Sequence, residues 1–256
     1  MECLRTAAKL LPAPLRRPCR DFINQQVWGL ARQFVRSRRS ELAVTLDMVL
    51  SDFRSRHRDV FFLQVGALDG VSADPLYSLV EKHELRGILV EPQADFFNQL
   101  RSNYAAFGPS RFVFVNAAIA ETDGRRSLYR IRAGSSGPSW MHGTASFDRH
   151  SVTKHRRAIP NVESLVTVEE VRCITFATLF RETQAEHVDL LQIDAEGYDA
   201  KILQFFDLPA RMPAIVRFEH THLPQDDHLR CLNNLIQLGY GISVGVEDTL
   251  AYLRKQ

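Results

Sequence analysis

Three acidic residues, Glu91, Asp194 and Glu219, each end a short run of apolar residues in this 256-residue sequence. Unbroken apolar runs of this length are typical of strands buried in a parallel sheet, so each acid is expected at the end of a strand. An acid in that position can accept hydrogen bonds from both hydroxyl groups of a ribose. One strand-end acid is commonly only solvated, but three of them beside a glycine turn indicate a ligand-binding site.

The glycine turn follows the first buried run, V-F-F-L-Q-V at residues 60–65. Gly66 and Gly70 can adopt backbone angles that other residues resist, and neither carries a side chain that would obstruct a ligand. Asp74 and Pro75 are expected as the N-cap and the first residue of the next helix. Strand, glycine turn and helix in this order open a nucleotide-type site at the carboxyl end of a parallel sheet.

Asp69, inside this turn, distinguishes between the two cofactor classes that use such a frame. A nicotinamide dinucleotide needs space for a pyrophosphate, normally formed by a complete G-x-G-x-x-G turn at a helix N-terminus. The carboxylate of Asp69 would repel a pyrophosphate, whereas the ammonium and sulfonium groups of S-adenosylmethionine would tolerate it. The charge therefore favours S-adenosylmethionine as cofactor, with a nicotinamide-dependent oxidoreductase as the alternative.

These residues require an α/β fold, because a parallel sheet brings the carboxyl ends of its strands to one edge. Apolar runs indicate strands near residues 60–65, 87–91, 112–115, 171–175, 188–194, 214–219, 242–244 and 250–253. Residues 127–131 alternate in polarity as a hairpin return would. The carboxyl ends of the parallel strands carry Gly66, Glu91, Asn116, Asp194 and Glu219.

The chain is predicted to have an N-terminal helical extension at residues 1–57 and one α/β domain at residues 58–256. Apolar residues recur at helical spacing over residues 23–34 and again over residues 42–53. Residues 133–165 interrupt the α/β pattern with a polar, glycine-containing segment. A long insertion of this kind in a compact domain favours a substrate-facing loop.

Composition limits the partners and the location of the protein. The net charge is +2, and the early cluster of basic residues fits a solvated helical face better than a nucleic-acid site. No apolar run reaches the length of a membrane span, and the N-terminus lacks the apolar core of a secretory signal. The four cysteines are far apart with no C-x-x-C pair, which argues against a structural metal and for free thiols. We therefore expect a cytoplasmic protein without a nucleic-acid partner.

Four segments together resemble the FkbM family of methyltransferases, namely F-L-Q-V-G-A-L-D-G, G-I-L-V-E-P, D-L-L-Q-I-D-A-E-G and I-V-R-F-E-H. The resemblance covers roughly residues 58–222, and I-D-A-E-G is its most specific part. It implies a class I, Rossmann-like methyltransferase fold that uses S-adenosylmethionine. The implied fold has helices on both faces of a mostly parallel seven-stranded sheet, which ends in an antiparallel strand pair. The resemblance also implies methylation of a hydroxyl oxygen on a sugar, glycan or secondary metabolite.

The sequence departs from the family pattern in three places. Gln64 stands where many members have aspartate, and Leu68 stands where asparagine is frequent. The segment T-F-A-T at residues 175–178 replaces the usual leucine followed by acids. This last departure leaves the role of the segment open, and it keeps a non-catalytic binding protein on the same fold as an alternative.

The resemblance also implies where the cofactor lies. By motif position, Gly66, Asp69 and Gly70 would line its methionine end. Glu91 would bind the ribose, and Asp194 would face the methyl-transfer centre. The full set of expected cofactor-binding residues is Gly66, Ala67, Asp69, Gly70, Glu91, Pro92, Asn116, Ala117 and Asp194.

Methylation of an alcohol requires a group that removes its proton. We expect Asp194, Glu219 and His220 to be the catalytic residues. His220 is the expected base, because it directly follows a strand-end acid and histidine titrates near neutral pH. In a strand, His220 and His222 would point to the same face and could bind a metal with either acid. The sequence does not decide whether a metal binds. It favours His222 as a polar strand-end residue, and Tyr198 as a packing residue or a pocket wall rather than a base.

Overall fold

The structure is a computed structural model that describes residues 44–108, 110–132 and 134–253. The predicted helix at 23–34 and most of the predicted extension at 1–57 lie outside these residues. A compact unit begins at Thr45, the N-cap of helix α3 (Leu46–Arg56), whose Oγ1 accepts a hydrogen bond from the Met48 N–H at 3.2 Å. The domain boundary expected after residue 57 stays a prediction.

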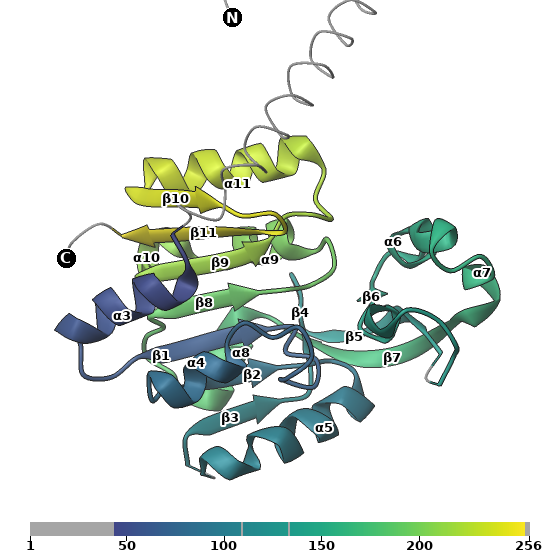
Figure 1. The fold of residues 1–256 in the computed structure, drawn as a ribbon, viewed down its shortest axis with the longest axis horizontal. Coiled ribbons are helices and arrows are strands. Elements are labelled where there is room, and N and C mark those ends of the chain that lie inside the picture. The colour runs from purple at the N-terminus through teal and green to yellow at the C-terminus, as the bar shows by residue number, and fades with distance from the viewer. Residues whose placement is uncertain (1–43, 109, 133, 254–256) are drawn as a thin grey trace, which may run out of the picture. The chain divides into compact units, whose positions relative to one another are not determined.

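Seven strands of the described chain form the main sheet, in the order β10-β11-β9-β8-β1-β2-β3 (Figure 1). The pairs from β9 to β3 are parallel, whereas β11 pairs antiparallel with both β9 and β10. This topology confirms the predicted mostly parallel sheet with an antiparallel C-terminal pair. The strands are β1 (Phe61–Val65), β2 (Arg86–Val90), β3 (Phe112–Val115), β8 (Leu190–Ile193), β9 (Ile215–Glu219), β10 (Tyr240–Val244) and β11 (Asp248–Leu253).

The register of the central strands places the expected site residues side by side. Val65 at the end of β1 is opposite Val90 of β2 on one side and Ile193 of β8 on the other. The three strands therefore end at the same level, and the residues that follow them converge. All four residues of β8 are buried, as are the last four of β1, which explains why both runs are apolar apart from Gln64 and Gln192.

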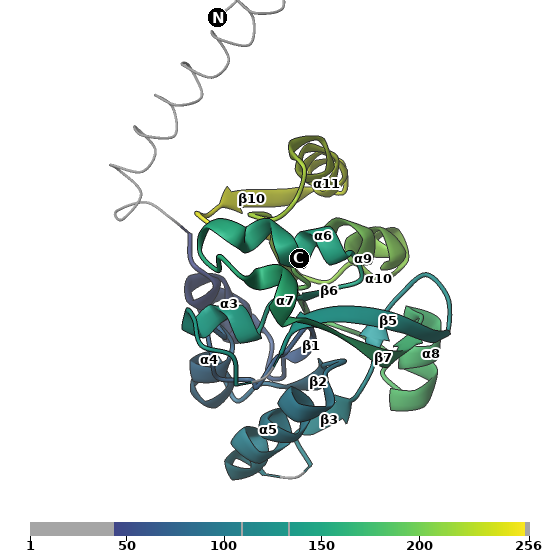
Figure 2. The same cartoon turned by 90° about the vertical axis from the view of Figure 1, so that its right-hand side faces the viewer.

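Helices cover both faces of this sheet (Figure 2). Helices α3, α4 and α5 lie on one face, and α8, α9, α10 and α11 lie on the other. Phe176, Leu203 and Leu235 from the second group share a buried core with the central strands. None of the described helices is long and apolar enough to cross a membrane. The helices are α4 (Tyr77–Lys82), α5 (Ala94–Tyr104) with the 3₁₀ helix η1 (Ala105–Phe107), α8 (Phe176–Thr183), α9 (Asp199–Phe205), α10 (Leu208–Arg211) and α11 (Gln225–Gln237).

Helix α4 begins later than the sequence suggested. Its N-cap is Leu76 and its first residue is Tyr77, so Asp74 and Pro75 lie in the turn before it. Asp74 Oδ1 accepts a hydrogen bond from the Leu76 N–H at 2.7 Å. The carboxylate therefore stabilises the turn, which is a related but different role from the predicted helix cap.

A second sheet, which the sequence did not reveal, contains β4 (Ala118–Ile119), β5 (Gly124–Ile131), β6 (Ala145–Ser146) and β7 (Val166–Ile174). Its order is β4-β7-β5-β6, and the predicted strand at 171–175 belongs to it, beginning already at Val166. Burial alternates along much of β7, as expected for a strand with one exposed face. The predicted hairpin return, β5, pairs with β7 across the insertion, with Ile131 opposite Val166.

The insertion at 133–165 is not the irregular loop that the sequence suggested. Besides β6, its described part forms short helices with a small core of their own, made by Met141, Val152, Ile159 and Val162 against Ile131 of β5. The rest of the insertion is mostly polar, which is why the sequence resembled a loop. The helices are η2 (Ser139–His142), α6 (Arg149–Thr153), η3 (Lys154–Arg157) and α7 (Val162–Leu165).

Candidate functional site

A cavity of about 400 Å³ lies at the carboxyl ends of β1, β2 and β8. This volume falls within the usual range for sites that bind small molecules. His142 and Phe147 of the insertion complete its wall. The expected site residues that line it are Gly66, Ala67, Glu91, Pro92, Ala117 and Asp194. The expected residues outside this lining are Asp69, Gly70, Asn116, Glu219 and His220.

Gly66 is required by the protein's own packing. Its φ is +78°, and a Cβ atom placed there would lie 1.8 Å from the backbone oxygen of Asp194. The exits of β1 and β8 can therefore touch only if this residue is glycine. Gly70 has a φ of +73°, and a Cβ there would lie 2.4 Å from Leu100 Cδ1. Both glycines are required by close packing against protein atoms, and Gly66 also lines the cavity.

Glu91 is the buried acid of the cavity, with 2% of its surface exposed. Its Oε2 accepts a hydrogen bond from the Leu68 N–H at 2.9 Å, and its Oε1 accepts one from the Gln93 N–H at 2.8 Å. Burial raises the pKa of Glu91 to about 7, although these two donors oppose the rise. The acid therefore lies in the cavity wall, where a residue that binds a ribose is expected, and its pKa is near neutral.

Asp69 and Asn116 hold the backbone around the cavity. Asp69 Oδ1 accepts hydrogen bonds from the Val71 N–H at 3.0 Å and the Ser72 N–H at 2.7 Å. Asn116 Nδ2 donates to the backbone oxygen of Glu91 at 2.8 Å. Both side chains thus stabilise the strand exits, and their expected contact with a cofactor stays a prediction.

Several carboxyl groups gather behind Asp194, and burial raises their pKa values. The pKa of Asp194 rises to about 6, with the nearby Asp248 carboxylate as the next cause. The pKa of Glu219 rises to about 9 through burial and then through repulsion by Asp194. Asp199, fully buried, accepts hydrogen bonds from the Ala195 and Gly197 N–H groups at 3.3 and 3.2 Å. Asp199 therefore holds the loop after β8.

His220 and His222 have different surroundings, because β9 ends at Glu219 and the alternation of a strand does not continue to them. The His220 ring stacks on His228 with centroids 4.3 Å apart, and its Nδ1 is 3.1 Å from Thr249 Oγ1. His222 Nε2 instead lies 3.3 Å from Glu196 Oε2. The side chains of His220 and His222 therefore do not lie on the same face of a strand, as the sequence suggested they would.

The sequence did not identify Glu196 and His155 as partners of His222. One potential ligand atom from each of the three residues lies within 4.8 Å of the others. Glu196 lies in the recognisable D-A-E-G segment, so its place near Asp194 was available from the sequence. His155 comes from η3 in the insertion, and only the tertiary fold brings it to the end of β8.

Two buried glutamines face the cavity. Gln64 of β1 and Gln192 of β8 are neighbours in the sheet register, and both line the cavity. Gln192 is 0% exposed, and neither of its amide atoms has a hydrogen-bond partner among the described residues. Buried amides normally find partners, so this pair indicates a polar ligand. Gln64 also occupies the position at which the sequence departs from the family's aspartate.

An aromatic wall lies on the insertion side of the cavity. Phe147 and Tyr198 meet edge to face with ring centroids 5.4 Å apart, and both line the cavity. The guanidinium carbon of Arg126 lies 4.1 Å from the Phe147 ring centroid. Tyr198 therefore lies in the pocket wall, in agreement with its expected place. Such a surface suits the apolar face of a ring-shaped ligand.

The unusual segment at 175–178 has a structural role. Thr175 is the N-cap of α8, and its side chain accepts a hydrogen bond from the Thr178 N–H at 3.2 Å. Asp123 Oδ1 accepts from the Thr175 N–H at 2.7 Å, and its Oδ2 accepts from the Thr178 hydroxyl at 2.6 Å. None of the three residues lines the cavity. The departure from the family pattern therefore caps a helix.

The strand order, with parallel strands from β9 to β3 and an antiparallel C-terminal pair, defines a class I methyltransferase fold with its cavity at the carboxyl edge. The sequence matches the family model described as the methyltransferase FkbM domain over residues 64–242. The protein belongs to the FkbM methyltransferase family. The sequence matches no curated protein.

Solved structures with a similar fold include other methyltransferases. One is a methyltransferase FkbM from Methylobacillus flagellatus KT, with 13% sequence identity and a TM-score of 0.48. That match covers 76% of this chain and 43% of the other, so this chain spans less than half of its length. Another is an O-methyltransferase from Bacillus cereus in complex with SAH, with 10% identity, a TM-score of 0.40, and coverage of 92% and 96%. These similarities are weak, and the family assignment depends on the family model.

Proposed function

We propose that this protein transfers a methyl group from S-adenosylmethionine to a hydroxyl oxygen of a small molecule or glycan. The observation that carries this proposal is the position of Glu91, a buried carboxylate after β2 that lines the same cavity as Asp194. Membership of the FkbM methyltransferase family supports the reaction class. The acceptor class comes from the sequence resemblance and is part of the proposal.

The polar groups of the cavity fit the parts of S-adenosylmethionine that need partners. Each oxygen of Glu91 accepts one backbone N–H and retains capacity for a ribose hydroxyl. Gln192 offers a buried amide to the amino-acid end of the cofactor. Asp74 and Asp194 also line the cavity, and their negative charge suits an ammonium and a sulfonium group.

Bound S-adenosylmethionine supplies an electrophilic methyl group, so the protein must align the acceptor and remove its proton. We place Asp194 at the methyl-transfer centre, because it lies where the exits of β1 and β8 meet. Phe147 and Tyr198 would hold the apolar face of the acceptor. Glu219 lies outside the cavity lining, and because its pKa is raised to about 9 by burial and by Asp194, it is a neutral carboxylic acid at pH 7.

The base that we propose differs from the one expected from the sequence. His220, the base expected from the sequence, lies beside Thr249 and outside the cavity lining. His142 lines the cavity, and its buried Nδ1 has no hydrogen-bond partner among the described residues. A histidine in this position can accept the proton of an acceptor hydroxyl, so we assign that role to His142.

Titration calorimetry with S-adenosylhomocysteine and with NAD tests the cofactor class. The proposal predicts binding of S-adenosylhomocysteine at one site per chain and no binding of NAD. Binding of NAD alone would support the oxidoreductase alternative. Binding of neither, by a protein shown to be folded by its thermal transition, would support the non-catalytic alternative. The expected cytoplasmic location stays a prediction.

A further inference from the structure

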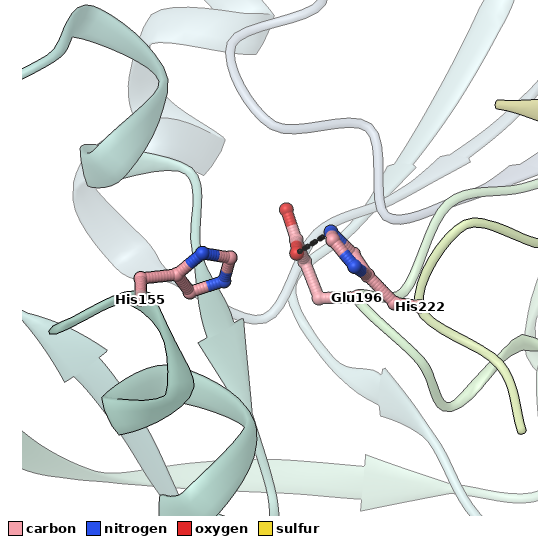
Figure 3. A group of neighbouring side chains, drawn as sticks. All are labelled: His155, Glu196 and His222. Carbon is pink, nitrogen blue, oxygen red and sulfur yellow. Dashed lines mark ion pairs between the residues drawn. The ribbon is translucent and has the colours of Figure 1, made fainter. Parts of the chain in front are cut away.

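Three side chains from segments far apart in the sequence meet next to the cavity (Figure 3). His155 comes from η3 of the insertion, Glu196 follows β8, and His222 follows β9. One nitrogen or oxygen of each lies within 4.8 Å of the others. Figure 3 shows the His155 ring and the His222 ring on either side of the Glu196 carboxylate. Since Glu196 also lines the cavity, this cluster borders the place where an acceptor would bind.

The contacts around His222 make this arrangement compact. His222 Nε2 is 3.3 Å from Glu196 Oε2 and 3.7 Å from Glu219 Oε1. The centroids of the His155 and His222 rings are 5.7 Å apart. Glu219 Oε2 is buried and has no hydrogen-bond partner among the described residues. A second carboxyl group, with one oxygen not used in a hydrogen bond, therefore lies next to the cluster.

The geometry of this cluster differs from that of a simple ion pair. Two imidazole rings lie on either side of one carboxylate, and one potential ligand atom of each residue lies within 4.8 Å of the others. Two imidazoles and one carboxylate that converge from three separate segments are ligands of the kind that a metal ion requires.

We propose that His155, Glu196 and His222 bind a divalent transition-metal ion of the zinc type. Two imidazoles and one carboxylate form a known ligand set for zinc, and they leave one position for water or substrate. Zinc lies about 2.0–2.2 Å from such ligands, so tetrahedral ligand atoms are about 3.4 Å apart. Rotation of the His155 side chain toward the other two would close the remaining gap.

The consequence for the reaction rests on the proposed function. A hydroxyl group that occupies the open position would have a lower pKa, because the cation stabilises the alkoxide. Its proton could then pass to a cavity base such as His142. The metal would in this way orient the acceptor, while Glu91 and Gln192, which line the same cavity, would hold the cofactor.

Titration of zinc into the chelator-treated full-length protein tests the site directly. The wild type should bind one zinc ion, and Glu196→Gln and His222→Gln should each weaken binding by at least about 100-fold, more than the loss of an outer-shell partner. His187→Gln is the matched control, because His187 is an exposed histidine 3.7 Å from Asp189 at the opposite end of β8. It should bind zinc like the wild type. Zinc should raise the melting temperature of the wild type and the control only.

The visible spectrum of the wild type with cobalt(II) provides a readout that needs no variant to fold. An intense spectrum of a four-coordinate site, removed by added zinc, is expected. A spectrum equal to that of cobalt in buffer would overturn the inference, as would magnesium binding without zinc binding. Equal zinc binding by Glu196→Gln would also overturn it.

Titration with S-adenosylhomocysteine separates this inference from the proposed function. A protein that binds S-adenosylhomocysteine but no zinc overturns the metal site alone. A protein that binds zinc through these residues but no S-adenosylhomocysteine supports the site and contradicts the proposed function.

Discussion

The carboxylate of Glu91 accepts a hydrogen bond from the backbone N–H of Leu68 at 2.9 Å, so the end of β2 is tied to the glycine turn after β1. Leu68 has a φ of +48°, which is uncommon for a residue with a branched side chain. The strained turn directs this N–H at the acid. A contact between the two loops is therefore present before any ligand binds, and a ligand held by Glu91 would find its site already formed.

The first prediction concerns the pH dependence of cofactor affinity. The pKa of Glu91 is about 7, and ribose hydroxyls are bound best by the ionised form, which only accepts hydrogen bonds. Below pH 7 the group must first lose a proton, so the affinity for S-adenosylhomocysteine should fall as pH decreases, by up to about tenfold per pH unit. Calorimetric titrations from pH 5.5 to pH 8.5, spanning about 1.5 units on either side of this pKa, measure this.

Glu91→Gln should weaken binding at pH 8 by at least about tenfold, because charge-assisted bonds contribute about 1.5–3 kcal/mol each. The variant should also have a flatter pH profile. Glu121→Gln, at an exposed position, is the control and should resemble the wild type. An unchanged profile in Glu91→Gln would remove this residue from the cofactor site.

Asp194→Asn should reduce the rate at saturating acceptor while S-adenosylhomocysteine affinity and melting temperature change little. The reason is that Asp199, and not Asp194, binds the N–H groups of the loop after β8. The loss should be about 10²-fold or more, as for other groups that act only in the transition state. The rate would be measured with an acceptor found by screening hydroxylated compounds for methyl incorporation.

Asp189→Asn is the matched control at the other end of β8. Asp189 Oδ2 accepts a hydrogen bond from the Phe61 N–H at 2.8 Å, so this variant should lose about 1 kcal/mol of stability without a change in rate. A normal rate in Asp194→Asn would contradict the assignment of Asp194 to the methyl-transfer centre.

The sequence predicted the strand ends well, because their positions follow from local rules. Glu91 and Asp194 each follow an apolar run, and parallel pairing brings such ends together. The sequence alone did not show why glycine is required in the turn after β1. Gly66 is required by a backbone oxygen of another strand, and this contact depends on the tertiary fold.

The folded structure of the insertion at 133–165 could not be predicted from local sequence for the same reason. The pairing of β5 with β7 joins segments on either side of it, and no spacing rule in the sequence specifies that register. His155 reaches His222 only through that folded insertion. The expectation that His220 and His222 share a face assumed that the strand continues to them, but β9 ends at Glu219, so the strand periodicity did not apply.

The fourth prediction compares two histidines as the base. His142→Gln should lower the rate at saturating acceptor by about 10²-fold or more, because His142 lines the cavity. His220→Gln should change the rate much less, because His220 stacks on His228 outside that lining. Rates of both variants across the pH range decide the assignment. A large loss in His220→Gln with normal turnover in His142→Gln would restore the base expected from the sequence.

Substitution of Phe147 tests the acceptor wall. Phe147→Leu removes the edge-to-face contact with Tyr198 and the cation–π contact with Arg126. Each contact of this kind stabilises a structure by about 0.5–1.5 kcal/mol. The acceptor KM should rise severalfold, with S-adenosylhomocysteine affinity unchanged. Phe176→Leu, in the buried core at the first residue of α8, should instead lower the melting temperature without a selective effect on KM. An unchanged acceptor KM in Phe147→Leu would exclude the aromatic wall from acceptor binding.

Thr175→Val should destabilise the protein without affecting cofactor affinity. The loss of the N-cap of α8 should cost about 0.5–2 kcal/mol, measured by denaturant unfolding. Thr183→Val is the matched control, because the Thr183 hydroxyl donates to the Leu179 backbone oxygen within the same helix. It should lower the free energy of unfolding less than Thr175→Val does. A loss of S-adenosylhomocysteine binding by folded Thr175→Val would mean that this segment takes part in the site.

A crystal structure with S-adenosylhomocysteine bound tests the central claim most directly. The account predicts that the ribose hydroxyls lie within hydrogen-bonding distance of the Glu91 carboxylate, with the sulfur atom facing Asp194 in the cavity at the ends of β1, β2 and β8. A ligand bound elsewhere, or a ribose turned away from Glu91, would contradict it.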